Sequence, residues 1–143
     1  MKTLLKRAGG GLAALALAIQ LWPAGRTNPP VVADLVAPIE VEILLRRACY
    51  DCHSNETRWP WYAYVAPVSW MIVEDVEHGR EVMNFSEWGR YDEKKRAKRA
   101  SHAVDEIEDG EMPLSKYVRM HPEAAVSGEE LELLRRWAES LED

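Results

Sequence analysis

Cysteine is rare in this chain of 143 residues: it has two, and both lie within Cys49-Tyr50-Asp51-Cys52-His53. If both thiols bind a cofactor, no structural disulfide remains, and the cofactor takes the place of such a crosslink. Positive charge is also in deficit, since the formal net charge is −6 at pH 7. This acidic balance argues against general nucleic-acid binding, so no nucleic-acid partner is expected.

Strand patterns are missing as well, because no segment alternates convincingly between apolar and polar residues, and no internal repeat is present. The predicted fold class is therefore all-α. Four stretches carry helix signals. They are residues 39–48 with Ile39, Ile43, Leu44 and Ala48 near helical spacing, 69–83 with Ser69 as N-cap, 91–108 before Gly110, and a last helix opened by the capping box Ser127-Gly128-Glu129-Glu130. Residues 111–117 and His121-Pro122 are predicted to be irregular.

No apolar run reaches the roughly 18 residues of a confident transmembrane helix. The N-terminal segment begins with basic residues and continues with an apolar run over residues 9–22. Its length is typical of a signal peptide, whereas the weak cleavage site Trp22-Pro23-Ala24-Gly25 keeps an uncleaved anchor open. We expect residues 1–25 to be a signal peptide or an N-terminal membrane anchor that forms a hydrophobic helix, 26–38 a proline-rich extended linker, and 39–143 the folded domain.

The two cysteines and the following histidine form the C-x-x-C-H haem-attachment pattern. On a helix, Cys49, Cys52 and His53 stand at i, i+3 and i+4, so one flat ring can meet all three. Each thiol would bind a haem vinyl group as a thioether, and His53 would bind the iron as its proximal ligand. Residues 54–62 are interpreted as a loop packed on this haem. Six tryptophans against one phenylalanine suit large rings lining the pocket and ordinary core filling equally well.

Two other uses of the same residues are weaker. A thioredoxin-like C-x-x-C belongs beside a βαβ pattern, which this chain lacks. Zinc binding by Cys49, Cys52, His53 and a distant histidine would use accepted ligand types, but no second close-spaced ligand pair exists. An exported chain also suits haem attachment through cysteines, so haem is favoured over both.

The ligand on the other face of the iron is less certain. The candidates are Met71, Met83, Met112, Met120, His78, His102 and His121. Met112 is the preferred sixth ligand, because Pro113 fixes the backbone beside it in a loop that follows Gly110. Met71 and Met83 are interpreted as core residues. His78 and His102 are expected at the surface, and His121 in a turn.

Charged side chains near these motifs have two alternative roles. Arg58 and Arg80 are candidate partners of the haem propionates, with ordinary surface pairing as the alternative. The basic run over residues 90–99 is interpreted as a solvated helix face, or as a docking surface for an acidic redox partner.

Several short motifs together resemble the haem-binding domain family of small exported bacterial c-type cytochromes. They are Cys49-Tyr50-Asp51-Cys52-His53-Ser54-Asn55, Trp59-Pro60-Trp61-Tyr62, Gly79-Arg80, Asn84-Phe85-Ser86-Glu87-Trp88, Met112-Pro113, Tyr117, His121-Pro122 and Arg26-Thr27-Asn28-Pro29-Pro30. The resemblance implies a covalent haem c with His53 as proximal ligand and is consistent with Met112 as distal ligand. It also implies a histidine shortly before Gly79-Arg80, where this chain has Asp75.

These observations predict an all-α, cytochrome c-like domain with one covalent haem c and its iron. Its cofactor-binding residues would be Cys49, Cys52, His53 and Met112, of which His53 and Met112 would bind the metal. We expect an electron carrier rather than an enzyme, passing single electrons between redox partner proteins. The alternative is a haem enzyme or sensor with an open or exchangeable sixth position, for peroxide reduction or gas sensing. The expected location is periplasmic or otherwise extracytoplasmic, secreted or anchored to the inner membrane.

Overall fold

The computed structural model describes residues 2–142, and within them every regular element is helical. The predicted all-α class is thus confirmed for the described residues. The α-helices are α1 Lys2–Ala18, α2 Ile39–Ala48, α3 Tyr50–His53, α4 Val68–Val82, α5 Glu93–Glu108, α6 Ser115–Met120 and α7 Gly128–Glu139. Short 3-10 turns connect them: η1 Ile19–Leu21, η2 Trp61–Tyr64, η3 Phe85–Arg90 and η4 Pro122–Ala124.

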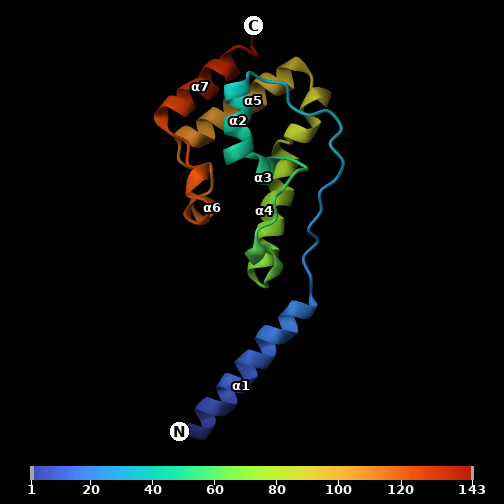
Figure 1. The fold of residues 1–143 in the computed structure, drawn as a ribbon, viewed down its shortest axis with the longest axis vertical. Coiled ribbons are helices and arrows are strands. Elements are labelled where there is room, and N and C mark those ends of the chain that lie inside the picture. The colour runs from blue at the N-terminus through green and yellow to red at the C-terminus, as the bar shows by residue number, and fades with distance from the viewer. Residues whose placement is uncertain (1, 143) are drawn as a thin grey trace.

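The helices form two connected parts (Figure 1). In one, α5 packs on α7, and α2 contacts α7 before it leads into α3. In the other, α3 lies on α4, and the start of α4 packs with η2. Helix α6 extends from the part formed by α2, α5 and α7 and lies opposite α3 and α4 (Figure 1). The motif at Cys49–His53 therefore lies where the two parts meet.

The hydrophobic core joins α2, η3, α5 and α7. Its centre is aromatic: Tyr50 stacks on Phe85 with ring centroids 5.0 Å apart, and Trp88 packs on Trp137 at 5.7 Å. The face that α2 buries consists of Val41, Leu44, Leu45 and Ala48. Of the four apolar residues near helical spacing, Leu44 and Ala48 belong to this face, whereas Ile39 and Ile43 are exposed.

Two of the three helix ends for which the sequence predicts a capping or stop residue have it in the structure. The capping box is present, with Ser127 and Glu130 each accepting a hydrogen bond from the other's backbone N–H. Gly110, with φ 75°, ends the turn after α5 as expected. Ser69, however, is not an N-cap: α4 begins at Val68 after Pro67, so Ser69 lies inside the helix and is buried.

The segment predicted to be irregular after Gly110 is partly helical. Residues 111–114 have no helix, but α6 covers Ser115–Met120 and η4 covers Pro122–Ala124. The apolar pattern of this stretch is too short to predict a helix of one and a half turns. Its structure comes from packing, since α6 and η4 contact each other and η4 contacts α2.

Residues 23–38 are extended and lie along the domain (Figure 1). The side chain of Asn28 donates to the carbonyl of Thr57 at 2.9 Å, and the backbone N–H groups of Val32 and Ala33 both donate to the carbonyl of Ser86. Leu35 enters the hydrophobic core. The proline-rich segment is therefore packed against the domain along part of its length. On the N-terminal side of this segment, α1 extends away from the domain (Figure 1). No helix among the described residues is long and apolar enough to cross a membrane.

Candidate functional site

The Cys49–His53 motif contains a short helix of its own, because the helical conformation of α2 ends before Cys49, the first cysteine of the motif. Cys49 has φ −124° and ψ −33°, so α2 ends at Ala48 and α3 starts at Tyr50. The carbonyl of Cys49 accepts from the N–H groups of Cys52 at 3.2 Å and His53 at 2.9 Å. One helical turn thus connects the three motif residues, and all three line one cavity.

This cavity has a volume of about 350 Å³ and separates the two parts of the fold. One wall is made of α3 and α4, and the other of α5 and the chain from Met112 to α6. The lining residues are Ala48, Cys49, Cys52, His53, Asp75, His78, Gly79, Val82, Met83, Arg99, His102, Ala103, Glu106, Ile107, Met112, Pro113, Leu114 and Tyr117. The lining is largely apolar, as expected of a site for a flat hydrophobic cofactor.

The His53 ring is fixed by α4. Its Nδ1 lies 2.9 Å from the carbonyl oxygen of Gly79 and 3.2 Å from that of Met83. Both carbonyls are acceptors, so Nδ1 carries the hydrogen and Nε2 is left with a lone pair. Burial lowers the pKa of His53, which favours the neutral imidazole that binds metals. The backbone thus sets the tautomer that a metal ligand needs.

Gly79 is required by a close backbone approach between α3 and α4. A Cβ at this position would lie 2.6 Å from the carbonyl oxygen of Cys52, which is too close for any side chain. This glycine lets α4 approach the motif closely enough for the carbonyl of Gly79 to reach the His53 ring.

A buried polar network fastens the chain after the motif to η3. The backbone N–H of Asn55 donates to Ser86 Oγ at 2.9 Å, and the Asn84 side chain donates to Asn55 Oδ1 at 2.9 Å. Asn84 Oδ1 in turn accepts from the N–H of Ser86. Every buried side-chain polar atom of the described residues has a partner. These residues therefore have a structural role, which holds the motif against the aromatic core.

Cys49 and Cys52 carry free thiols. Burial raises the pKa of each thiol to about 12, so both are protonated at neutral pH. A dithiol redox site needs the opposite, a lowered thiol pKa that exposes a thiolate nucleophile. Zinc binding needs a ligand cluster, and the described residues contain no group of three His, Cys, Asp or Glu side chains arranged to hold a metal ion. Neither alternative gains support from this geometry.

The structure separates the seven candidates for the sixth ligand. Four of them line the cavity: Met112 and His102 on the wall opposite α3, and Met83 and His78 on the α4 side. Met71 and Met120 are about half exposed and do not line it. His121 is also outside, because its Nε2 lies 2.6 Å from the Tyr62 hydroxyl and its ring stacks on Tyr117.

Met112 is positioned by the turn at Gly110. Its backbone N–H donates to the carbonyl of Glu106 at 3.0 Å, which ties the residue to the last turn of α5. Its side chain lines the same cavity as Cys49, Cys52 and His53, so the structure brings together all four residues that the sequence selected.

Asp51 connects the two walls beside the cavity. Its carboxylate accepts from the Arg58 guanidinium at 3.1 Å and from the Tyr117 hydroxyl at 2.7 Å. Arg80 donates to the carbonyl of Ser54 at 2.7 Å and to Thr57 Oγ1 at 2.8 Å. Arg58 and Arg80 therefore hold the protein's own structure together and do not line the cavity.

Sequence reasoning missed the charged residues of the cavity wall on α5. Arg99 belongs to the basic run over residues 90–99, and the His102 side chain is 54% exposed as predicted, but both also line the cavity at a spacing of i, i+3. Together with Ala103 and Glu106 they form a second face of α5, next to the buried face of Ala100 and Val104. That spacing is visible in the sequence, but the sequence does not show which face meets the motif.

Asp75 stands where the resemblance implies a histidine, and it also lines the cavity. Its carboxylate pairs with Lys116 of α6 at 2.8 Å, so this position contributes an ion pair between the two walls.

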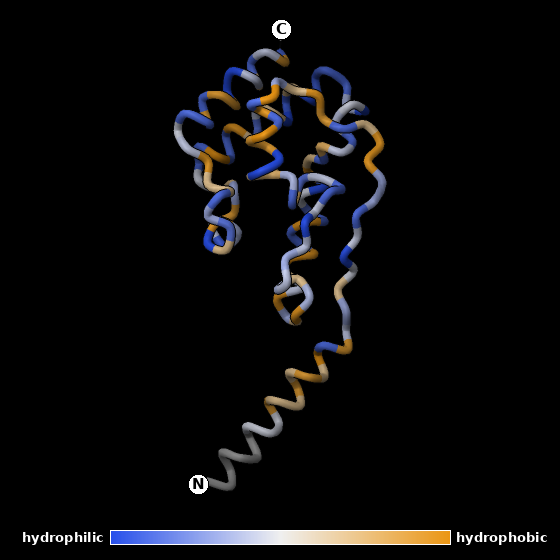
Figure 2. Tube along the Cα trace, viewed as in Figure 1, coloured by the Kyte–Doolittle hydropathy of each residue, from blue (hydrophilic) through white to orange (hydrophobic). Residues whose placement is uncertain are grey.

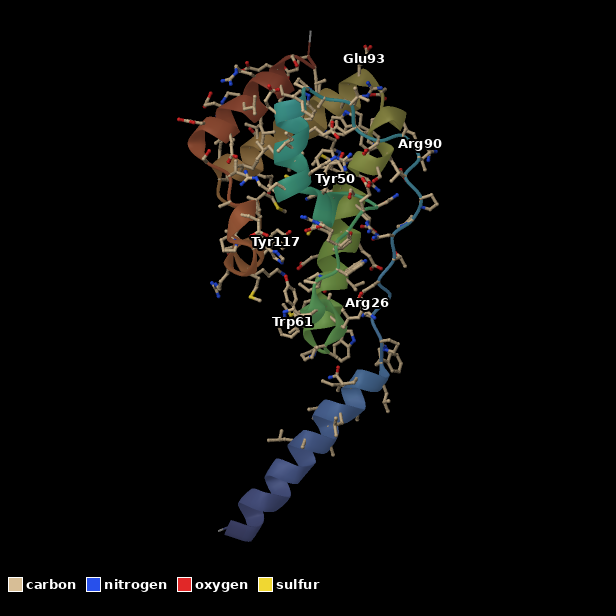
Figure 3. The ribbon with its side chains drawn as sticks, in the orientation of Figure 1. Arg26, Tyr50, Trp61, Arg90, Glu93 and Tyr117 are labelled. Carbon is tan, nitrogen blue, oxygen red and sulfur yellow. The ribbon has the colours of Figure 1, made fainter. Side chains whose placement is uncertain are left out.

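The prediction that the loop 54–62 packs on the cofactor is wrong, because none of its residues lines the cavity. No tryptophan lines the cavity either, so of the two roles left open for the tryptophans the structure supports core filling. Trp88 and Trp137 fill the core as ordinary packing residues. Trp61 is 73% exposed at the far end of α4 (Figure 3).

The fold and the cavity define a helical domain with a partly buried histidine, two thiols and a thioether around one apolar space. A comparison with protein families gives the same class: residues 14–140 match the model of the haem-binding domain family, and the chain belongs to this family. No curated protein and no solved structure matched the chain.

Proposed function

We propose that this chain is a monohaem c-type cytochrome that passes single electrons between redox partners outside the cytoplasm. The observation that carries the proposal is the convergence of Cys49, Cys52, His53 and Met112 on one apolar cavity, in a chain of the haem-binding domain family. A haem would supply an iron that changes oxidation state by one electron.

The residues present fit such a group. His53 offers Nε2 because Nδ1 is fixed on two backbone carbonyls. Cys49 and Cys52, one helical turn apart, would hold the ring by thioethers, and Met112 would supply the sixth ligand. The chain's own contribution is to orient these ligands, to keep the site apolar, and to place the charged Arg99 and Asp75 at its wall.

Covalent attachment is the first property to test. The chain is produced with haem-attachment machinery, denatured and separated on a gel that is stained for haem. The wild type should retain haem, whereas the double variant Cys49→Ala/Cys52→Ala should lose it on denaturation. A wild-type band without haem, from a sample whose native spectrum shows haem, would contradict c-type attachment while leaving haem binding intact.

A second candidate function is a haem enzyme or sensor with an open or exchangeable sixth position. The observation that favours it is the pair Arg99 and His102, a cation and an imidazole on the wall opposite α3. The absorption spectrum separates the two functions. A six-coordinate low-spin form in both oxidation states supports electron transfer, and a high-spin resting ferric form supports the enzyme or sensor.

The partner is proposed to be a redox protein with an acidic surface. Helix α5 carries exposed Lys94 and Lys98 beside Arg99 at the cavity, although Arg96 and Lys95 are engaged with the backbone and ring of Tyr91. Complementary charge speeds encounter and is screened by salt, so the electron-transfer rate should fall as ionic strength rises. A rate independent of salt contradicts this docking surface.

The location is likewise part of the proposal. The basic start of the chain and the apolar residues of α1 favour export, with the N-terminal segment as a cleaved signal or as an anchor to the inner membrane.

A further inference from the structure

The end of the domain formed by η2 and the first turns of α4 exposes an unusual number of large apolar side chains. We call this surface the η2 face. It consists of Trp61, Tyr64, Val65, Val68, Trp70 and Met71. Trp61 is the most exposed of them at 73%, followed by Tyr64 at 59% and Met71 at 50%. Contiguous apolar exposure of this kind marks an interaction surface rather than ordinary surface variation.

The η2 face adjoins the helix that leaves the domain. The Gln20 side chain donates to the carbonyl of Ala66 at 3.0 Å and accepts from its N–H at 2.9 Å. The indole N–H of Trp70 donates to the carbonyl of Trp22 at 3.0 Å. Ala18, Ile19, Trp22 and Trp70 together line an open apolar depression. The end of η1 is thus fastened to the η2 face.

The apolar surface continues along α1. Leu12, Leu15, Leu17, Leu21 and Trp22 are all exposed. Figure 2 shows hydrophobic segments of the chain at the lower end of α4 and along the neighbouring part of α1. Exposed apolar side chains therefore lie both on α1 and on the end of the folded domain that adjoins it.

The chemistry of the η2 face points to lipid. No residue from Trp59 to Val73 is charged, in a chain whose formal net charge is −6. Indole and phenol rings combine an apolar body with a polar group, and they gather at the boundary between lipid and water. Arg26 lies at this surface: its guanidinium lies over the Tyr64 ring at 4.2 Å and donates to the carbonyl of Ala63 at 3.0 Å, which leaves further N–H donors for a lipid phosphate. A protein partner that is guided by electrostatic attraction would instead need a charged surface at this place.

We propose that the η2 face lies against the surface of a lipid bilayer into which the apolar part of α1 inserts. The domain then has two attachments, and the second fixes its orientation. This inference extends the N-terminal anchor of the proposed function, because the η2 face belongs to the folded domain and contacts lipid through different residues. The cavity, which shares no residue with the η2 face, is left free of lipid.

The test uses the full haem-loaded chain in phosphatidylcholine vesicles, with and without phosphatidylglycerol. The vesicles contain a phosphatidylcholine that carries a photoactivatable group near the headgroup, and labelled peptides are identified by mass spectrometry. Peptides of residues 59–73 should be labelled to an extent comparable with residues 12–22. Their labelling should exceed that of residues 39–48 at least about tenfold, because only side chains that are buried in the lipid surface lie close to the photoactivatable group.

Residues 39–48 are a matched control, since Ile39 and Ile43 are 62% and 60% exposed but do not belong to the η2 face. The variant Trp61→Gln/Val68→Gln/Met71→Gln should reduce labelling of residues 59–73 about tenfold and leave residues 12–22 unchanged. The variant Ile39→Gln/Ile43→Gln should change neither. An unchanged haem spectrum and melting temperature show that each variant is folded.

Three outcomes overturn the proposal. If residues 59–73 are labelled no more than residues 39–48 while residues 12–22 are labelled strongly, the chain has an anchor but no second contact. If neither 59–73 nor 12–22 is labelled, the anchor is rejected too, while the haem spectrum reports separately on the proposed function. If the face is covered by a second copy, sedimentation shows a dimer that the triple variant dissociates, and residues 59–73 stay unlabelled.

Discussion

The two walls of the cavity are held by different kinds of contact. On the α3–α4 wall, the backbone does the positioning: the carbonyls of Gly79 and Met83 fix the His53 ring, and Gly79 leaves no room for a side chain against Cys52. On the α5–α6 wall, side chains from a largely exposed helix and a turn reach the cavity, and Met112 is tied by one backbone hydrogen bond to Glu106.

This difference assigns different roles to the walls. Backbone contacts tolerate little change, so the α3–α4 wall fixes the position of the His53 ring. Side chains on the α5–α6 wall can be exchanged without rebuilding the fold, so this wall is suited to adjust the sixth position and the local charge. Four variants test the contrast, in order of decreasing expected effect.

The largest effect is expected for Gly79→Ala, which changes the packing of the α3–α4 wall. The new Cβ would meet the Cys52 carbonyl at 2.6 Å, so the helices must separate. Unfolding in urea should show a loss of about 2–3 kcal/mol, and the haem content of the purified protein should fall. Gly128→Ala is the matched control, because a Cβ there meets nothing within 4 Å, and it should change stability by less than about 0.5 kcal/mol. Equal urea midpoints for Gly79→Ala and the wild type would show that the close approach is unimportant.

Next is Met112→Ala on the opposite wall. This variant should keep its haem and lose little stability, but its iron should bind added ligands. The affinity of the ferrous form for carbon monoxide should rise at least about tenfold, because a competing thioether is removed. Met83→Leu is the control within the same cavity, and it should leave the affinity unchanged. Carbon monoxide binding no better than in the wild type would show that Met112 is not the ligand.

A smaller effect is expected for Tyr117→Phe, which removes a contact between the walls. The hydroxyl donates to the carboxylate of Asp51 at 2.7 Å, and burial with this hydrogen bond raises the pKa of Tyr117. The loss should be about 1–2 kcal/mol in urea unfolding, as for a hydrogen bond to a charged group. Tyr64→Phe, at an exposed ring outside the cavity, should cost almost nothing. If both variants are equally stable, the two walls are not joined through Asp51.

The smallest effect concerns the support behind the α5–α6 wall. Glu130 caps α7 and pairs with Arg47 at 2.6 Å, and the hydrogen bonds to Ser127 and Arg47 lower the pKa of Glu130 below its ordinary value of 4.5. A lowered folded-state pKa stabilises the fold above the unfolded-state value and loses this contribution as pH falls through the folded-state value. Glu130→Gln should therefore cost about 0.5–1 kcal/mol at pH 7, and the difference should fade below pH 4.5. A constant difference across this range would mean that the carboxylate charge has no part in it.

Several features of the site could be predicted because they depend on neighbours in the chain. The spacing of Cys49, Cys52 and His53 needs only one helical turn, and the capping box of Ser127 and Glu130 needs only four residues. The choice of Met112 depended on a local turn at Gly110, which the structure contains and which leads the side chain to the cavity.

Other features were misjudged because they depend on contacts between distant elements. His102 and Arg99 belong to the cavity wall because α5 presents that face, and nothing in the local sequence distinguishes it from a solvated face. The charge of Arg58 and Arg80 makes them candidate partners of haem propionates. In the structure, however, Arg58 donates to Asp51 and Arg80 donates to Thr57. Composition leaves two roles open for the tryptophans, because it does not say whether a ring fills the core or faces outward.

From the sequence alone follow the all-α class, the haem-attachment pattern and the residue types able to bind iron, because each depends on residue chemistry and on spacing within one element. Only the tertiary structure decided which of seven candidate ligands reach the cavity, and that the carbonyl of Gly79 fixes the His53 ring. The reason is physical: helical periodicity determines which side chains share a face, whereas core packing between helices determines which faces meet.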